Sequence, residues 1–266
     1  MTTDNANGAM EDYMTNIKDV VLNTLIFVED LKAGKSQLAM LQEMKAVGYK
    51  KAEVRREFLN LATEPKQIGS YAKENGMDIF YSVPEKLYTN GELNAKQLET
   101  YFKEAQEMTS RYIKIIIGEY TQMRAIDGVI ISGLCEKYNI NLSVENDQTP
   151  ENGKCAKILA FLQDCQANVV NVGMTFDTGN WLWVAEDPVE SARILSKFVT
   201  YIHIKDILSP QALQMTMLGE GSVPMADILQ ALPKGLPTAL EYPMDGSFET
   251  IDKESEKLMK IASPVV

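Results

Sequence analysis

Four residues able to bind a divalent metal ion lie at or near the ends of four successive apolar segments in the second half of the chain. They are Glu145, Asp177, His203 and Glu241, and His203 is the only histidine among the 266 residues. Three carboxylates and one imidazole suit Mn²⁺ or Mg²⁺, tolerate Co²⁺ or Zn²⁺, and leave coordination positions for substrate oxygens. Considered singly, each of the three acidic residues could be a solvated loop residue or a helix cap, and His203 could have a structural role. Their recurrence on four consecutive segments favours one shared metal site.

The apolar segments that carry these residues belong to a longer series with the length and composition of β-strands. The series comprises Val21–Phe27, Lys51–Arg55, Met77–Val83, Tyr112–Ile117, Ile140–Glu145, Val170–Asp177, Tyr201–Lys205 and Thr238–Tyr242. Helical periodicity fills the connections, with start signals at Ser36 and Asp187 and a stop signal at Asn75-Gly76. Each predicted strand is thus followed by a predicted helix.

An unbroken alternation of strands and helices requires a mostly parallel sheet, and eight units in about 250 residues match a closed (β/α)₈ barrel. A doubly wound open sheet is the alternative, but it often has a glycine-rich turn after its first strand. Here the first predicted strand runs into Val28-Glu29-Asp30-Leu31. We therefore expect a flexible lead-in over residues 1–16 and one α/β domain, a single (β/α)₈ TIM barrel, over residues 17–266.

Active sites of such barrels lie at the C-terminal ends of the strands, where polar residues that close an apolar segment gather. Neighbouring strands are ~4.8 Å apart, so inward side chains from consecutive strand ends can reach one ligand. The same location makes Asn180, Trp181, Lys205 and Asp206 candidate substrate-binding residues. The Trp181 indole could cover an apolar sugar face or pack on a helix. Lys205 could bind an oxyanion or form a structural ion pair, and Asn180 could be a turn residue.

Composition narrows the classes of partner. The net charge of −11, from 26 basic and 37 acidic residues, opposes binding to nucleic acid and to anionic membranes. The N-terminus has neither the basic patch nor the apolar stretch of an export signal, so we expect a cytoplasmic protein. The three cysteines lack CxxC spacing and fall in helical segments, which indicates neither disulfides nor a zinc knuckle. A homo-oligomer is compatible with the sequence, which does not specify the oligomeric state.

Several motifs together resemble the xylose isomerase-like barrel superfamily, and within it the sugar phosphate isomerase/epimerase group. The resemblance spans the chain and is most specific in its second half. It rests on Glu145-Asn146, the Asp177-Thr178-Gly179-Asn180 segment followed by Glu186-Asp187-Pro188, His203-Ile204-Lys205-Asp206, the turn from Leu218 to Pro224, Leu240-Glu241, and Glu53 with Arg55 in the second predicted strand.

This resemblance implies one divalent metal ion, most often manganese, bound by Glu145, Asp177, His203 and Glu241. It also implies that the catalytic Glu145 and Glu241 handle protons on opposite faces of a small sugar, polyol or related hydroxy-carbonyl substrate. Chelation of a carbonyl and its neighbouring hydroxyl acidifies the adjacent C–H and stabilises an enediolate. One proton-transfer group on each face would epimerise the carbon, whereas one group working on a single face would isomerise.

Three other functions remain to be weighed. An inosose-type dehydratase uses the same enolate chemistry to expel water. A non-catalytic barrel would bind a sugar without converting it. A three-zinc apurinic endonuclease of the same superfamily is disfavoured, because one histidine cannot supply three zinc ions and the acidic charge opposes DNA. The chain also departs from the epimerase pattern in two places. Asn180 stands where these enzymes often carry a histidine, and the arginine that they use after the metal-binding histidine of the seventh strand has no clear match here beyond Asp206.

Overall fold

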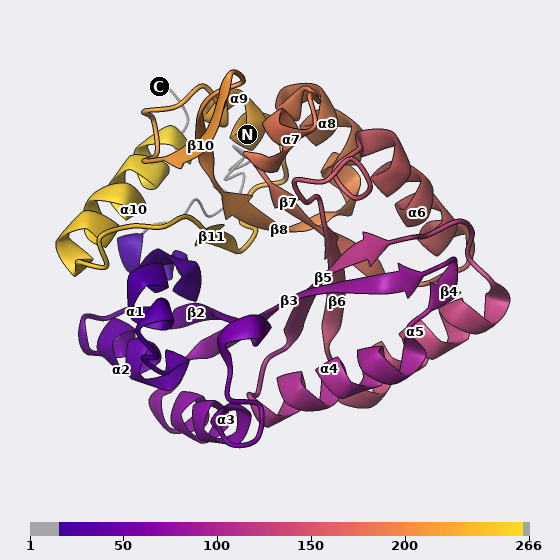
Figure 1. Cartoon of the computed structure of the whole chain (residues 1–266), viewed down its shortest axis with the longest axis horizontal. Coiled ribbons are helices and arrows are strands. Elements are labelled where there is room, and N and C mark those ends of the chain that lie inside the picture. The colour runs from indigo at the N-terminus through magenta and orange to yellow at the C-terminus, as the bar shows by residue number, and fades with distance from the viewer. Residues whose placement is uncertain (1–15, 263–266) are drawn as a thin grey trace, which may run out of the picture.

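The computed structural model describes residues 16–262, and in it eight parallel strands close into a barrel (Figure 1). The neighbours run in the order β2, β1, β11, β8, β7, β6, β5, β3, and pairing of β2 with β3 closes the ring. The strands are β1 Val21–Asn23, β2 Lys51–Arg55, β3 Asp78–Thr89, β5 Tyr112–Gly118, β6 Asn141–Glu145, β7 Val172–Asp177, β8 Val199–Ile204 and β11 Thr238–Leu240. The predicted single barrel is confirmed, whereas the lead-in predicted before it falls almost entirely on residues 1–15, outside the described residues.

Helices surround the strands as an outer ring (Figure 1). They are α1 Val28–Lys32, α2 Gln37–Ala46, α3 Glu64–Asn75, α4 Ala95–Glu107, α5 Ala125–Tyr138, α6 Cys155–Ala167, α7 Asn180–Trp183, α8 Pro188–Leu195, α9 Met225–Ala231 and α10 Phe248–Ala262. The expected caps are present: the Ser36 side chain accepts from the Ala39 N–H, and Asp187 accepts from two N–H groups of α8. Between residues 16 and 262, every helix is too short or too polar to cross a membrane.

Local side-chain chemistry shortens the first strand relative to the prediction. The strand was expected to reach Phe27, but β1 ends at Asn23, whose side-chain oxygen accepts from the Leu25 N–H at 2.8 Å. That cap starts a 3₁₀ turn over Thr24–Phe27, in which Ile26 and Phe27 are buried in the core. The chain also forms two hairpin extensions that the sequence pattern did not predict. They involve β4 Glu92–Leu93, and β9 Asp206–Ser209 with β10 Ala212–Thr216.

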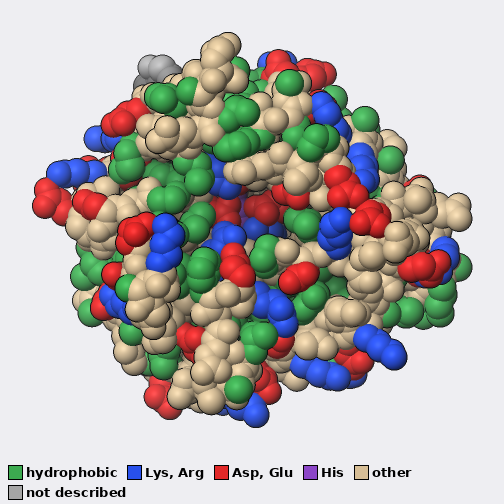
Figure 2. Space-filling view, in the orientation of Figure 1, with side chains coloured by type: hydrophobic (Ala, Val, Ile, Leu, Met, Phe, Trp, Pro, Cys, Tyr) green, Lys and Arg blue, Asp and Glu red, His purple; other side chains and the backbone are tan. Residues whose placement is uncertain are grey.

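Aromatic side chains close the barrel interior toward the amino-terminal ends of the strands. The Phe80 ring stacks on Tyr112 at 4.5 Å and on Tyr201 at 4.8 Å, with Val21 and Ala239 in the same buried cluster. Polar and charged side chains occupy the interior beyond this aromatic layer. Figure 2 shows them as acidic and basic groups at the bottom of a central recess. The apolar layer excludes water from one side of these groups, which strengthens the electrostatic interactions among them.

Gly118, the last residue of β5, is required by both its backbone conformation and its surroundings. Its φ is +77°, and an added Cβ would lie 2.3 Å from the Tyr88 carbonyl oxygen. Gly118→Ala should therefore lower the free energy of unfolding by about 2–4 kcal/mol, through left-handed strain together with overpacking. Gly34 is the matched control, because its φ is +84° but nothing lies within 4 Å of its added Cβ. Gly34→Ala should cost only about 1–2 kcal/mol in denaturant titrations, and equal losses would contradict the role of the contact with Tyr88.

Candidate metal and active site

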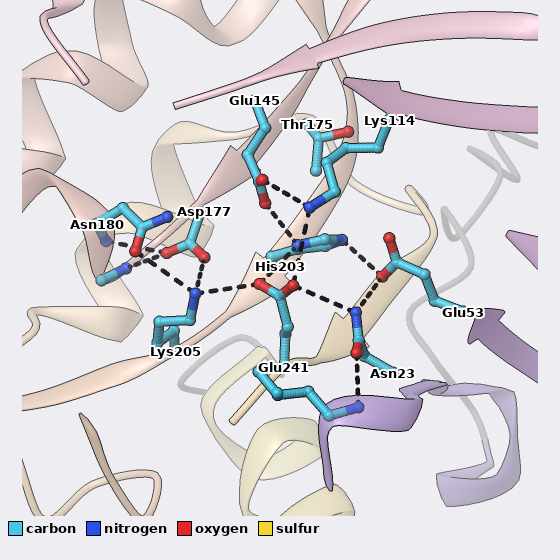
Figure 3. A network of polar contacts seen from close by, with 12 residues as sticks. Asn23, Glu53, Lys114, Glu145, Thr175, Asp177, Asn180, His203, Lys205 and Glu241 are labelled. Carbon is cyan, nitrogen blue, oxygen red and sulfur yellow. Dashed lines mark hydrogen bonds and ion pairs between the residues drawn. The ribbon is translucent and has the colours of Figure 1, made fainter. Parts of the chain in front are cut away.

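The four residues singled out in the sequence converge inside the barrel. Glu145, Asp177 and His203 lie on β6, β7 and β8, and Glu241 directly follows β11. All four side chains are buried, and one potential ligand atom from each lies within 4.8 Å of the others. Figure 3 shows the carboxylates of Glu145 and Glu241 approaching His203 from opposite sides. The parallel register of the strands brings together residues that are up to 96 positions apart in the chain (241 − 145).

Hydrogen bonds from the following turn leave one oxygen of Asp177 available as a ligand. Its Oδ1 atom accepts from the backbone N–H groups of Gly179 and Asn180, each at 2.9 Å. The Asn146 amide, on the adjacent strand end, bonds both the N–H and the carbonyl of Asp177. The carboxylate therefore has a fixed direction, and Oδ2 points toward the Lys205 amine at 2.6 Å.

The imidazole of His203 lies between the two glutamates. Its Nδ1 atom is 2.9 Å from Glu145 Oε1 and 3.0 Å from Glu241 Oε2. On the side of the aromatic layer, the Tyr201 ring makes an edge contact with the imidazole of His203, with ring centroids 4.7 Å apart. The ring is thus held at the boundary between the aromatic layer and the charged layer.

Three cations balance the buried carboxylates. Lys114 Nζ is 2.6 Å from Glu145 Oε2 and 3.8 Å from Glu241 Oε1, and Lys205 Nζ is 3.1 Å from Glu241 Oε2. Arg55 donates to Glu241 Oε1 at 2.7 Å. Buried charges are tolerated only when they are paired, so these contacts account for the stability of an acidic cluster inside the barrel.

The pairing changes the acid–base properties of the carboxylates unequally. Burial raises the pKa of Asp177 to about 6, although the Lys205 ammonium opposes this effect. Burial also acts to raise the pKa of Glu241, but Lys205, His203 and Lys114 outweigh it and hold the pKa well below the usual range. Burial also acts to raise the pKa of Glu145, but Lys114 and His203 together outweigh burial and the repulsion from Glu241, so this pKa is lowered as well. Both glutamates are therefore ionised at neutral pH.

The candidate substrate-binding residues are placed in different ways. Lys205 and Asn180 lie in the charged layer, where Lys205 Nζ approaches Asn180 Oδ1 at 3.4 Å. The Trp181 ring is fully buried and packs against Phe176 at 5.2 Å. The Asp206 carboxylate accepts from backbone N–H groups of Ile207, Gly219, Gly221 and Val223. Asp206 thus ties down the loop after β10, and in this structure its oxygens are directed at that loop.

Other residues of the site were missed or mentioned only as part of the family resemblance. Lys114 was missed, although a lysine inside the otherwise apolar strand from Ile113 to Ile117 is a visible signal of a buried partner. Glu53 and Arg55 matched the second-strand segment of the family, but they had no predicted role. The structure brings both into the charged layer, with Glu53 fully buried and Arg55 bonded to Glu241.

The donor set fits a divalent cation. Three carboxylates and an imidazole converge, and Glu145 Oε1 is a buried acceptor with no hydrogen bond of good geometry within the described chain. Residues Glu145, Asp177, His203 and Glu241 are therefore able to bind a divalent metal ion. Lys205 now occupies the oxygens of Asp177 and Glu241, so binding of an ion requires the ammonium to move aside.

A second cavity lies at the opposite ends of the strands. It has a volume of about 580 Å³ and is lined in part by Lys51, Asp78 and Tyr112, the first residues of β2, β3 and β5. The amino-terminal end of a TIM barrel usually serves stability rather than catalysis. The carboxylate cluster therefore remains the candidate active site.

Comparisons with known proteins agree with the fold. Three solved structures share the fold at low sequence identity. A probable 3-DHS dehydratase, AsbF of Bacillus anthracis, is 17% identical, covering 91% of this chain and 97% of its own, with a TM-score of 0.65. The IolI protein with a bound zinc atom is 14% identical over 91% and 94%, with a TM-score of 0.61. D-Psicose 3-epimerase of Clostridium cellulolyticum H10 is 11% identical over 85% and 92%, with a TM-score of 0.59.

A search of curated proteins finds no match. A family model described as "Xylose isomerase-like TIM barrel" matches residues 41–261, which include β2 to β11 and all four candidate ligands. This match covers most of the chain. The chain therefore belongs to the xylose isomerase-like TIM barrel family.

Proposed function

We propose that this protein is a divalent-metal-dependent isomerase or epimerase of a small sugar or related hydroxy-carbonyl compound. The observation that carries the proposal is that two ionised glutamates, Glu145 and Glu241, approach the same atom, His203 Nδ1, from above and from below in the view of Figure 3. Membership of the family supports an enzyme of this type, and the epimerase and dehydratase among proteins of the same fold support the reaction class.

We infer that Glu145, Asp177, His203 and Glu241 would hold the metal ion, with Mn²⁺ the expected occupant and Mg²⁺, Co²⁺ or Zn²⁺ as alternatives. The ion supplies polarisation of a substrate carbonyl and acidity at the neighbouring C–H. The zinc atom in the IolI structure, a protein of the same fold, supports a metal-binding barrel but does not identify the ion used here.

The glutamates would transfer the protons. Glu145 and Glu241 are kept ionised by Lys114 and Lys205, so either can accept a proton from a substrate carbon at neutral pH. If one glutamate removes the proton and the other, protonated by a neighbouring lysine ammonium, delivers a proton to the opposite face, the carbon is inverted through an enediolate. Proton exchange with solvent would then restore both protonation states. Lys205, released from Asp177 and Glu241, would bind a substrate oxygen beside Asn180, and the buried site would keep bulk water from the intermediate.

A dehydratase is the second candidate, and the buried lysines favour it. Lys114 and Lys205 place two ammonium groups next to the proposed bases, and an ammonium can protonate a departing hydroxyl. Loss of water after proton abstraction would then replace proton return. The two reactions share their first step and differ in whether the product has lost one water.

Metal binding should stabilise the fold, because a ligand of the native state shifts unfolding by RT ln(1 + [L]/Kd). We expect Mn²⁺ or Co²⁺ to raise the melting temperature of chelator-treated protein in calorimetry. In His203→Ala the affinity should fall by at least about tenfold while the three carboxylates retain some binding. Unchanged melting of the wild-type protein, with no metal found in untreated protein, would contradict the site.

The affinity for metal should decrease in acid through protonation of Asp177. Its raised pKa of about 6 means that the metal-free carboxyl carries a proton below that pH, and this proton must leave before the oxygen can bind an ion. The plot of log affinity against pH should therefore steepen by about one unit of slope as the pH falls below about 6. Titration calorimetry on Asp177→Asn provides the comparison, and the same steepening in this variant would assign it to another group.

Solvent exchange tests the two glutamates. Glu145→Gln or Glu241→Gln keeps the shape and one coordinating oxygen but removes the base, so each should depress turnover by roughly 10²–10⁴-fold with metal still bound. In D₂O the wild-type enzyme should place deuterium on the carbon beside the carbonyl, detected by mass spectrometry over a panel of ketoses and inososes. Glu254→Gln is the matched control, because Glu254 is a buried glutamate of α10 that bonds Tyr242 and the Leu218 N–H, away from the cluster.

The outcomes separate the candidate functions. An epimerised, labelled product supports the two-base reaction, and a product lighter by one water, with or without label, supports the dehydratase. Conversion to an isomer without label over many turnovers would indicate a hydride shift or return of the proton by a single base, and would contradict the two-base reaction. No turnover of any compound by metal-loaded protein would favour a binding barrel.

A further inference from the structure

Glu53 is a buried carboxylate of the site that belongs neither to the four candidate ligands nor to the proposed proton transfer. It lies on β2 and is fully buried. Its Oε2 atom accepts from Asn23 Nδ2 at 2.9 Å and from the Tyr201 hydroxyl at 3.0 Å. The same oxygen is 2.9 Å from His203 Nε2 (Figure 3). A charge in this position needs partners, and β1 and β8 supply all three.

The two nitrogens of His203 therefore face different carboxylates. Nδ1 faces Glu145 and Glu241, whereas Nε2 faces Glu53 on the opposite side of the ring. In the present ring orientation Nε2 makes no hydrogen bond of good angle within the described chain, and Glu53 is its ion-pair partner. A nitrogen that binds a metal must carry no proton, whereas the other nitrogen of a ligating imidazole usually donates its N–H to an oxygen.

We propose that Glu53 is a positioning residue that holds the Nε2–H of His203 and so presents Nδ1 to the metal ion. This inference rests on the proposed metal site and adds to it the choice of ligand nitrogen. Asn23 and Tyr201 complete this arrangement, because the hydrogen bonds that they donate hold Glu53 Oε2 next to His203 Nε2. The edge contact of Tyr201 with the ring limits its tilt from the same side.

A purely structural Glu53 makes a different prediction. If its only task were to pair with Asn23 and Tyr201, its loss would lower stability without changing which nitrogen binds the ion. A positioning role requires the ligand nitrogen, or the exchange of the proton on the other nitrogen, to change. The chain has one histidine, so a ¹⁵N-histidine label reports on His203 alone.

The experiment uses full-length protein labelled with ¹⁵N-histidine and loaded with ¹¹³Cd²⁺, a diamagnetic probe of the same site. In the wild-type protein we expect cadmium coupling at Nδ1 and a slowly exchanging proton at Nε2. In Glu53→Gln the Nε2 proton should exchange faster, and metal affinity by calorimetry should fall about 10–100-fold, the usual effect of removing a partner of a ligating histidine. Tyr201→Phe leaves the carboxylate but removes one donor, so it should change both observables in the same direction by less.

Glu254→Gln controls for loss of a buried carboxylate and should leave both observables at their wild-type values. Cadmium coupling at Nε2 in the wild-type protein would overturn the inference while leaving the metal site intact. Unchanged proton exchange and affinity in Glu53→Gln would also overturn it, and if that variant does not fold, the same result in Tyr201→Phe decides. Failure of the wild-type protein to bind any metal would instead remove the proposed function, and this inference with it.

Discussion

The pairing of buried charges is the constraint on which the rest of this site depends. Four carboxylates, Glu53, Glu145, Asp177 and Glu241, lie inside the barrel with almost no exposure. Each would be strongly destabilising if left alone, because an unpaired charge loses its hydration on burial. Every one of them has a cation, an imidazole or fixed donors within hydrogen-bond distance, supplied by other strands of the ring. Closure of the barrel is what makes these partners available, since partners from β1, β2, β5 and β8 meet only at its axis.

The same pairing connects stability to chemistry. Lys205 pairs with carboxylate oxygens of Asp177 and Glu241, and both residues are also candidate metal ligands. In the proposed function, binding of an ion would therefore exchange one cation for another and would free the ammonium for a substrate oxygen. The aromatic layer of Phe80, Tyr112 and Tyr201 closes the site from below and keeps the surroundings poorly hydrated. In such surroundings small displacements of charge have large energetic effects.

Individual residues show how far sequence reasoning could reach. Each of the eight predicted strands overlaps an observed strand because apolar runs and helix caps are local properties of the chain, although β3 runs on to Thr89 beyond the predicted end at Val83. The end of β1 was missed because the Asn23 side chain caps the turn that follows it and also donates to Glu53. Lys114 was missed because a lysine in an apolar strand indicates a buried partner but does not identify it, and the partner, Glu145, lies 31 residues later. The Trp181 indole, expected either to cover an apolar sugar face or to pack on a helix, is buried and packs on Phe176 of β7.

The sequence by itself determined the barrel, its order of strands and helices, and the four polar residues that close its last strands, because strand periodicity and the position of a strand end are encoded within a few consecutive residues. Only the tertiary structure decided that these side chains meet, that Lys114, Lys205 and Arg55 balance them, and that Glu53 stands behind His203. These relations join residues up to 186 positions apart. They follow from the stagger and closure of the strands, which set the height and direction of each side chain and leave no trace in local pattern.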